Sequence, residues 1–268
     1  MNNKLFYGIL AVIIIVVILL FFAFGLNGSK KQSLEAFDQQ PVPSSVLALL
    51  RVPQNVSQAI GIGVATPPVK ISGTPMQVEG KPVVVYVGAE YCPYCAAQRW
   101  PLTIALMRFG NFTNLKYTLS DPNDVFANTP TFTFYGSSYS SQYVVFMPVE
   151  TTNRTGTRLE TPNALQNATF SAYDLNNPAI PKSSRGSIPF TDFGNSTMIL
   201  GSSYQPTSLQ NLNWSQIATA INDPSTLQSQ SIIGAANLMT AQICMLINNS
   251  DANVCGQQYI KSIEKSIG

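Results

Sequence analysis

The chain has 268 residues, a net charge of +2, charged side chains at only 10% of positions, and no histidine. Without an imidazole base, Ser-His-Asp and Cys-His hydrolases are excluded, and the commonest transition-metal ligand is missing. No stretch of Lys and Arg is dense enough to pair with phosphates, which argues against nucleic-acid binding.

An apolar segment near the N-terminus predicts a membrane anchor. Leu5 to Phe24 are twenty uncharged residues rich in Ile, Val, Leu and Phe, and a helix of that length spans about 30 Å, the thickness of the hydrocarbon core. The apolar region of a cleaved signal peptide is shorter, about 7–15 residues. Ala23 and Gly25 leave cleavage after Gly25 open, but the length favours a retained anchor over residues 1–26.

Sequons and cysteines indicate which side of the membrane holds the rest of the chain. Lysines flank the apolar segment at both ends, so the positive-inside bias decides nothing. All four cysteines follow residue 90, and an even number fits an oxidising compartment. Sequons are acceptors only in secreted compartments. Eight of them follow the segment, at Asn27, Asn55, Asn111, Asn153, Asn167, Asn195, Asn213 and Asn248. We therefore predict a single-pass protein of the cell membrane whose C-terminal part is extracytoplasmic and glycosylated.

Hydrophobic periodicity gives the order of the expected elements. Residues 27–66 predict a tether with short surface helices, followed by a weak hairpin around Gly73. Residues 83–87 are a continuous β-branched run, typical of a strand buried on both faces. Helical spacing follows from residue 93 to residue 109, and Pro101 is expected to kink this helix. The later expected elements are a strand at 115–119, a hairpin of 131–135 with 143–149, a helix at 164–173, a strand pair of 188–193 with 197–200, and helices at 214–221, 227–248 and 257–267.

Two cysteines three positions apart lie where the 83–87 strand gives way to the helix, in the sequence GAEYCPYC. This order places Cys92 at a helix N-terminus, where free N–H groups and the helix dipole stabilise a thiolate, the reactive form of cysteine. Pro93 falls in the first turn, where its missing N–H costs nothing. Cys95 lies a turn further in. We assign attack to Cys92 and resolution of the mixed disulfide to Cys95.

Other interpretations of this pair stay open. A zinc hook would need a second close pair of ligands, whereas Cys244 and Cys255 are separated by ten residues and the chain has no histidine. A purely structural bond across two residues would close too small a loop to restrict the unfolded chain much. An inactive relative of a redox enzyme would also carry such a pair. We expect neither a metal nor a cofactor.

The motif resembles the thioredoxin and protein disulfide isomerase superfamily. Ala89, Glu90, Tyr91 and Cys92 match the thioredoxin lead-in, and the Pro-Tyr pair between the cysteines resembles that of glutaredoxins. The whole chain, through the apolar segment and the stretches CPYC, TPTFTFYG and IPFTDFGN, resembles a family of archaeal membrane-anchored proteins with a thioredoxin-like ectodomain. The resemblance implies a thioredoxin-like three-layer α/β/α sandwich over residues 67–268 and thiol–disulfide exchange at Cys92.

The resemblance also implies a cis-proline opposite the dithiol, where the backbone of the preceding residue holds the substrate strand. The local sequence around Pro130, Thr-Pro-Thr-Phe, is similar to that of a thioredoxin cis-proline strand. Ile188-Pro189 is followed by a turn, a second strand and a terminal helix, which is the order of the superfamily's closing unit. We favour Ile188 and Pro189 as the substrate-binding pair and expect a cis bond there; a trans proline at a strand start is the ordinary alternative.

The sequence departs from the superfamily at positions that set reactivity. Tyr86 stands where thioredoxin has an acid inside the strand, and Glu90 is at best a partial replacement. Tyr94 stands where oxidising relatives have histidine. Arg99 can support the motif or be an ordinary solvated helix residue. Residues 120–187 exceed what thioredoxin uses, and we interpret them as an insertion that shapes a substrate surface.

Cys244 and Cys255 form a second pair near the C-terminus. A disulfide between them would close a loop of ten residues and stabilise the fold by about 2–3 kcal/mol. We favour this structural role over a second redox relay that exchanges electrons with Cys92 and Cys95.

Together these features predict an extracytoplasmic thiol–disulfide oxidoreductase that acts on protein thiols and disulfides. In an oxidising compartment its resting form is expected to hold a Cys92–Cys95 disulfide. A membrane redox partner that recharges the dithiol is implied by analogy only. The alternative is a glycosylated surface binding protein with a non-catalytic fold of the same kind.

Overall fold

The computed structural model describes residues 33–268. The expected anchor at Leu5–Phe24 and the sequon at Asn27 lie outside these residues. The chain divides into two compact units, residues 1–36 and 37–268, and the second contains all the strands and α-helices of the described part. No helix within residues 33–268 is long and apolar enough to cross a membrane.

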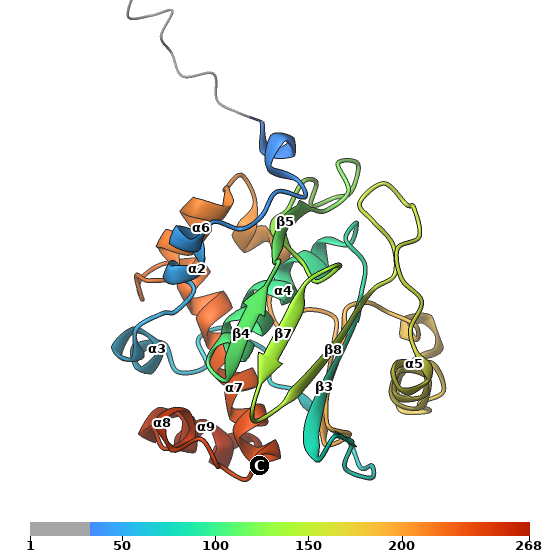
Figure 1. Ribbon diagram of the computed structural model, residues 1–268, viewed down its shortest axis with the longest axis vertical. Coiled ribbons are helices and arrows are strands. Elements are labelled where there is room, and N and C mark those ends of the chain that lie inside the picture. Colours follow the sequence, from blue (N-terminus) through green and yellow to red (C-terminus); the bar gives the residue numbers. More distant parts are fainter. Residues whose placement is uncertain (1–32) are drawn as a thin grey trace, which may run out of the picture. The chain divides into compact units, whose positions relative to one another are not determined.

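The second unit alternates short strands with helices (Figure 1). Its strands are β1 Val69–Lys70, β2 Gln77–Val78, β3 Lys81–Gly88, β4 Gly110–Thr113, β5 Lys116–Leu119, β6 Pro130–Thr133, β7 Ser138–Ser141, β8 Val145–Glu150, β9 Phe190–Phe193 and β10 Thr197–Leu200. Its α-helices are α2 Ser44–Leu49, α3 Gln54–Ile60, α4 Pro93–Met107, α5 Ala164–Phe170, α6 Trp214–Ala220, α7 Gly234–Leu246, α8 Ala252–Cys255 and α9 Gln258–Ile267. Short 3₁₀ turns are η1 Leu34–Phe37, η3 Lys182–Ser184 and η4 Pro206–Leu209, and single π-turns are η2 Ser171–Leu175 and η5 Ser229–Ile233.

Strand β3 is the centre of the main sheet. It pairs in parallel with β8 and antiparallel with β9, while β10 and then β1 continue the sheet beyond β9. The short β2 pairs with the first residues of β3. Residues 83–87 are buried on both faces, as their continuous apolar run predicts.

Helices cover both faces of this mixed sheet. On one face Val85 packs with Val149, Phe190 and Met198, and α5 lies against β3. On the other face the Tyr86 ring lies 5.9 Å from the Arg99 guanidinium carbon of α4, and α4 packs against α7. Figure 1 shows α5 and the α4–α7 pair on opposite sides of β3 and β8. The chain is therefore an α/β protein with a mixed central sheet flanked by helices.

Helix α4 runs through Pro101 without a break. Proline has no N–H to donate to the carbonyl four residues earlier, which here belongs to Ala97. The Tyr204 hydroxyl donates to the Ala97 carbonyl at 2.7 Å instead. This replacement leaves no buried carbonyl without a partner and explains why Pro101 does not end the helix.

The structure confirms one expected strand pair and rejects another. The expected pair of 188–193 with 197–200 is present as β9 and β10, joined by Gly194 and Asn195, both of which have positive φ. The expected hairpin of 131–135 with 143–149 does not form. β6 pairs with β5, β7 pairs with β4, and β8 joins β3 in the central sheet. In that parallel register Val145, Met147 and Val149 align with Val83, Val85 and Val87 of β3; Val149 is buried and the other two residues of β8 are half-buried against the core.

β3, α4 and β8 form a strand–helix–strand unit, and residues 108–144 connect α4 to β8. This segment contains the two-stranded β4–β7 and β5–β6 pairs. Residues 151–186 contain α5, which covers one face of the sheet. The range 120–187, which was expected to be an insertion, contains β8, and β8 pairs with β3 in the central sheet.

A buried carboxyl lies inside this core. Asp192 of β9 is fully buried, and its Oδ1 accepts one hydrogen bond, from the Asn195 N–H at 2.9 Å. Oδ2 has no partner within the described residues. Burial raises the pKa of Asp192 from 3.8 to about 7. The folded chain therefore keeps a proton that the unfolded chain releases near pH 4.

Replacing Asp192 by Asn is expected to change how stability depends on pH. In the wild type the free energy of unfolding should fall as the pH rises from about 4 to about 7, because only the folded state must bury the charge. Asp192→Asn should therefore be more stable than wild type at pH 8, by up to about 4 kcal/mol at about 1.4 kcal/mol per pKa unit. The difference should vanish near pH 4. Denaturant unfolding at several pH values, with Asp124→Asn in an exposed loop as control, measures it; a gain that is independent of pH would contradict the explanation.

Candidate functional site

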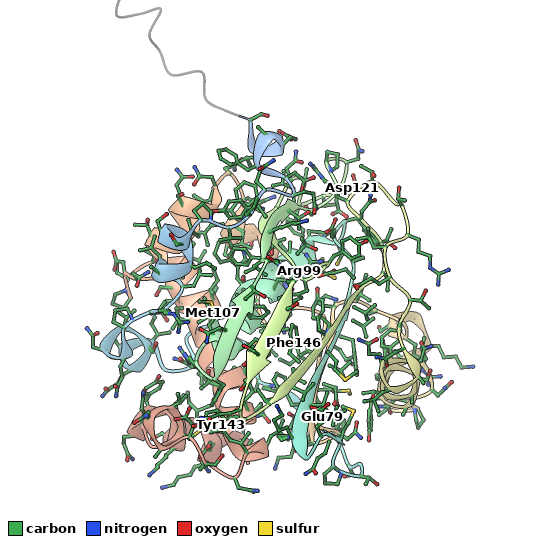
Figure 2. The ribbon with its side chains drawn as sticks, in the orientation of Figure 1. Glu79, Arg99, Met107, Asp121, Tyr143 and Phe146 are labelled. Atoms are coloured by element: carbon green, nitrogen blue, oxygen red, sulfur yellow. A yellow bond between two sulfur atoms is a disulfide. The ribbon has the colours of Figure 1, made fainter. Side chains whose placement is uncertain are left out.

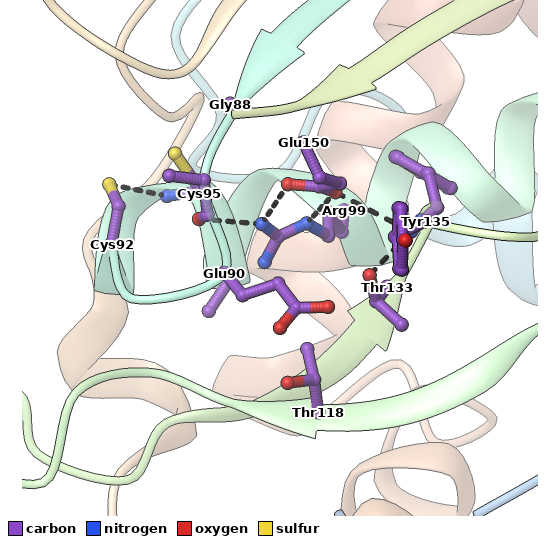
Figure 3. A network of polar contacts seen from close by, with 12 residues as sticks. Gly88, Glu90, Cys92, Cys95, Arg99, Thr118, Thr133, Tyr135 and Glu150 are labelled. Carbon is purple, nitrogen blue, oxygen red and sulfur yellow. Dashed lines mark hydrogen bonds and ion pairs between the residues drawn. The ribbon is translucent and has the colours of Figure 1, made fainter. Parts of the chain in front are cut away.

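The two cysteines lie at the junction of β3 and α4, at the carboxyl end of the central strand. Cys92 is the N-cap of α4, with an extended backbone, and Pro93 opens the helix. The Cys92 Sγ accepts a hydrogen bond from the Cys95 backbone N–H at 3.2 Å (Figure 3). A sulfur at this position satisfies one of the free N–H groups of the first turn and lies at the positive end of the helix dipole.

The two thiols differ in exposure and in the direction of their pKa shifts. Cys92 is 6% exposed and Cys95 is fully buried. The hydrogen bond from the Cys95 thiol lowers the pKa of Cys92; burial opposes this, and the backbone N–H of Cys95 and the charge of Arg99 reinforce it. Burial, together with the neighbouring Cys92, raises the pKa of Cys95 well above its ordinary value. Cys92 is therefore the thiol that ionises first and the one that solvent reaches.

The pair is present as two free thiols. This differs from the Cys92–Cys95 disulfide expected as the resting form. A dithiol and its disulfide interconvert with the redox poise of their surroundings, so the geometry described here is that of the reduced state. In this state the hydrogen bonds to the Cys92 Sγ are those that stabilise an attacking thiolate.

The Ile188–Pro189 peptide bond is cis. It lies at the start of β9, and the Ile188 carbonyl oxygen is 3.7 Å from the Cys92 Sγ. Pro189 is buried and Ile188 is half-buried. Pro130 is the first residue of β6, and its carbonyl accepts a hydrogen bond from the Trp100 indole at 2.9 Å. It is thus Ile188–Pro189, and not Pro130, that places a backbone carbonyl beside the Cys92 thiol.

A buried ion pair lies directly behind the dithiol. Arg99 of α4 donates to both carboxylate oxygens of Glu150, at 2.7 and 2.6 Å, and both side chains are fully buried. Arg99 also donates to the Ala89 carbonyl at 2.6 Å, just before the motif (Figure 3). The pair thereby connects α4 to the ends of both β3 and β8. The idea that Arg99 is a solvated helix residue is wrong; the side chain supports the motif.

Burial and charge act together on this ion pair. Burial favours the neutral form of Arg99, but the charge of Glu150 and the nearby acidic groups raise its pKa well above the ordinary value. Burial raises the pKa of Glu150, and the Arg99 guanidinium opposes that rise. The Phe134 N–H adds a hydrogen bond to Glu150 at 3.4 Å. The positive charge of Arg99 is therefore held within range of both thiols.

Glu90 lies under the same network but points away from the cysteines. It is 1% exposed, and its carboxylate accepts hydrogen bonds from the Gln39 amide at 3.3 and 3.4 Å. Figure 3 shows its side chain directed toward Thr118. No direct contact between this carboxylate and a cysteine exists within the described residues. Glu90 thus does not take the place of an acid beside Cys95.

Tyr86 lies inside β3, at the position that the resemblance to thioredoxin matches with an acid. It is fully buried, its hydroxyl has no partner in the described part of the chain, and burial raises its pKa well above the ordinary value. A neutral phenol cannot accept a proton as a carboxylate does. The deep side of the dithiol is therefore lined by a neutral Tyr86 and by the Arg99–Glu150 pair.

The outer side of the dithiol is aromatic. Tyr91 and Tyr94 are 37% and 38% exposed. The Tyr94 ring packs edge-on against Phe126, with centroids 5.8 Å apart, and the Tyr91 carbonyl accepts a hydrogen bond from the Asp121 N–H at 2.9 Å. Sequence reasoning missed Glu150 and Phe126, because both come from segments whose partners only the fold reveals.

The second cysteine pair is a disulfide between Cys244 and Cys255. It lies near the opposite end of the sheet from the dithiol. The Gly194 N–H donates to the Val83 carbonyl at the start of β3, and a Cβ added at Gly194 would be 2.8 Å from Leu246, two residues after Cys244. Five residues of β3 separate that end from Gly88, about 17 Å at 3.3 Å per residue. This separation excludes direct exchange between the two pairs in this conformation and favours the structural role.

Arg99→Met should destabilise the full chain, because it leaves the Glu150 carboxylate buried and unpaired. The expected loss in free energy of unfolding is about 3–5 kcal/mol, measured by denaturant titration. The double variant Arg99→Met/Glu150→Gln removes both charges and keeps an acceptor for the Phe134 N–H. It should recover most of the loss; an equal loss in the single and double variants would show that the charge pairing is not the cause.

Comparison with known proteins assigns the chain to a family. No curated protein matches the chain, and no solved structure matches it. Among the described residues, no three His, Cys, Asp or Glu side chains are grouped as metal ligands would be. A family model described as "Domain of unknown function (DUF929)" matches residues 67–245, which covers the central sheet, α4, α7 as far as Met245, and the dithiol. The chain belongs to the DUF929 family.

Proposed function

We propose that the protein is a thiol–disulfide oxidoreductase that uses Cys92 as nucleophile and Cys95 as resolving thiol. The observation that carries this proposal is the asymmetry of the pair. The Cys92 Sγ accepts a hydrogen bond from the Cys95 N–H at the start of α4, and Cys92 keeps 6% of its surface exposed, whereas Cys95 is fully buried. A structural pair has no need of a thiol with a lowered pKa at an accessible helix start.

In the reductive direction, the Cys92 thiolate attacks one sulfur of a substrate disulfide. The substrate S–S bond breaks, its second sulfur leaves as a thiolate, and a mixed disulfide forms at Cys92. Cys95 then loses its proton and attacks the Cys92 Sγ, which releases the first substrate sulfur as a thiolate. The protein ends with a Cys92–Cys95 disulfide and has given two electrons to the substrate. The reverse sequence oxidises a substrate dithiol.

The pKa shifts of the two cysteines explain why the attack by Cys92 comes before the attack by Cys95. The neighbouring Cys92 is one cause of the raised pKa of Cys95. Once the Cys92 sulfur is in a mixed disulfide it carries no charge, so this cause disappears and Cys95 ionises more readily. The positive charge of Arg99 favours that ionisation. The second step thus becomes easier only after the first has taken place.

The fold supports the proposal. A strand–helix–strand unit of β3, α4 and β8 is followed by β9, β10 and the C-terminal helices, with a cis-proline at the start of β9. This order resembles the thioredoxin superfamily, in which the residue before the cis-proline holds the substrate backbone. We assign this role to Ile188, whose carbonyl lies 3.7 Å from the Cys92 Sγ. The substrates are then extended segments of proteins that carry thiols or disulfides.

We also propose that this domain works outside the cytoplasm, anchored by the apolar segment at residues 1–26, with a membrane partner that restores the dithiol or disulfide. The buried Cys244–Cys255 disulfide supports an oxidising compartment. None of the seven described sequon asparagines belongs to the buried residues, which is compatible with glycosylation. The same observation favours the alternative of a glycosylated surface protein that binds a partner without turnover.

Activity of two cysteine variants separates these functions. The full chain should accelerate the reduction of insulin disulfides by dithiothreitol, and Cys92→Ser should reduce that acceleration to background. Cys95→Ser should instead accumulate a mixed disulfide at Cys92, because the resolving thiol is gone; mass spectrometry detects it. The control is Cys244→Ser/Cys255→Ser, which removes the distant pair and should keep the activity. Equal activity in wild type and Cys92→Ser would leave only the binding function.

A further inference from the structure

A second site lies at the other end of α4 from the dithiol. A pocket of about 170 Å³ is lined by Leu50, Arg51, Val52, Ile104, Met107, Arg108 and Val254. It lies where the α2–α3 connection and α8 meet the last turn of α4, and Figure 2 labels Met107 at this end of the helix. About thirteen helical residues separate Cys95 from Arg108, roughly 20 Å.

Two guanidinium groups line this otherwise apolar pocket without a carboxylate partner. The ion pairs of residues 33–268 are Arg99–Glu150 and Arg154–Asp38, and residues 1–32 contain no Asp or Glu at all. No acidic side chain of the chain therefore neutralises Arg51 or Arg108.

Neutral groups hold Arg108 in place. Its Nη1 donates to the Thr240 hydroxyl at 2.7 Å and its Nη2 to the Ser57 hydroxyl at 3.1 Å. Burial lowers the pKa of Arg108, and Tyr259 opposes this effect. Arg108 is half-buried, and hydroxyl groups satisfy its hydrogen bonds but do not compensate its charge. Arg108 thus lines the pocket with a guanidinium that neutral groups hold, and this charge has no carboxylate counter-ion within the described residues.

The C-terminal end of α4 compensates part of the positive charge of the two arginines. Arg51 donates to the Met107 carbonyl at 3.2 Å, one of the last carbonyls of α4, and to the Asn111 side chain at 2.8 Å. A helix C-terminus is equivalent to about half a negative charge. Arg51 alone exceeds that, and the side chain of Arg108 turns to α3 and α7 rather than to the helix end. More than one positive charge remains.

We propose that this pocket binds a small organic carboxylate, with the anion between Arg51 and Arg108 and a short apolar body against Ile104, Met107 and Val254. Guanidinium groups pair carboxylates through two parallel hydrogen bonds. A cavity of about 150 Å³ holds a molecule the size of benzene, so the whole ligand, with its carboxylate, has about six carbons. The apolar lining distinguishes such a ligand from sulfate or phosphate. Arg51 and Val254 come from outside the residues that match the family, 67–245.

The test uses the full chain with three probes of matched concentration: sodium hexanoate, 1-hexanol and sodium sulfate, at constant ionic strength. Hexanoate should raise the midpoint of thermal unfolding and bind in calorimetry, because it alone has both the charge and the apolar body. Hexanol lacks the charge and sulfate lacks the apolar body, so both should give at most a small shift. A shift with hexanol or sulfate equal to that with hexanoate, or no shift at all, would overturn the proposal.

Variants locate the site. Arg51→Gln changes an exposed side chain and should weaken hexanoate binding at least tenfold without loss of fold. Arg108→Gln should do the same, and Arg158→Gln, an exposed arginine elsewhere, should bind as the wild type does. Unchanged binding in Arg51→Gln would overturn the proposal even if Arg108→Gln failed to fold. Insulin reduction should stay the same in Arg51→Gln, so this test is independent of the dithiol.

Discussion

The buried ion pair between Arg99 and Glu150 is the contact on which the dithiol depends. It joins the second turn of α4 to the end of β8, and the same guanidinium holds the Ala89 carbonyl at the end of β3. The three elements that meet at the motif are thus fixed by one side chain. The attraction within a buried ion pair offsets the free energy of desolvation only when the hydrogen-bond geometry is good and the remaining donors and acceptors have partners. The Phe134 N–H on Glu150 and the backbone carbonyl on Arg99 meet much of that condition.

The reactivity of the pair follows from this framework. Because α4 is fixed at its first turns, the Cys95 N–H points at the Cys92 Sγ, and the Ile188 carbonyl lies 3.7 Å from the same sulfur. Thioredoxin-like proteins place an acid beneath the dithiol, and here a neutral tyrosine fills that position. The charge beneath the pair is consequently that of a cation held by a carboxylate. Such an arrangement favours thiolates over thiols at both cysteines, and burial restricts the benefit to Cys92.

The motif and the elements next to it could be predicted from the sequence, because they depend on short-range patterns of residues. The valine run predicts β3, the dithiol and Pro93 predict the start of α4, and the Gly-Asn turn predicts the β9–β10 pair. Partners distant in sequence were not predictable in this way. The alternation in residues 143–149 marks a strand but not whether it pairs with β6 or β3. Arg99 looks like any surface arginine until β8 brings Glu150 beside it, and Tyr204 shows no sign in sequence of replacing the hydrogen bond that Pro101 lacks.

The central claim is that Cys92 is an activated thiol and that Cys95 is not. Its most direct test is the pH dependence of alkylation by iodoacetamide, followed separately at each cysteine by mass spectrometry on the reduced full chain. Cys92 is expected to react with an inflection below the ordinary thiol pKa of 9.0, and Cys95 is expected to stay unreactive at pH values where Cys92 is fully alkylated. Equal rates at the two cysteines, or an inflection for Cys92 at or above 9.0, would contradict it.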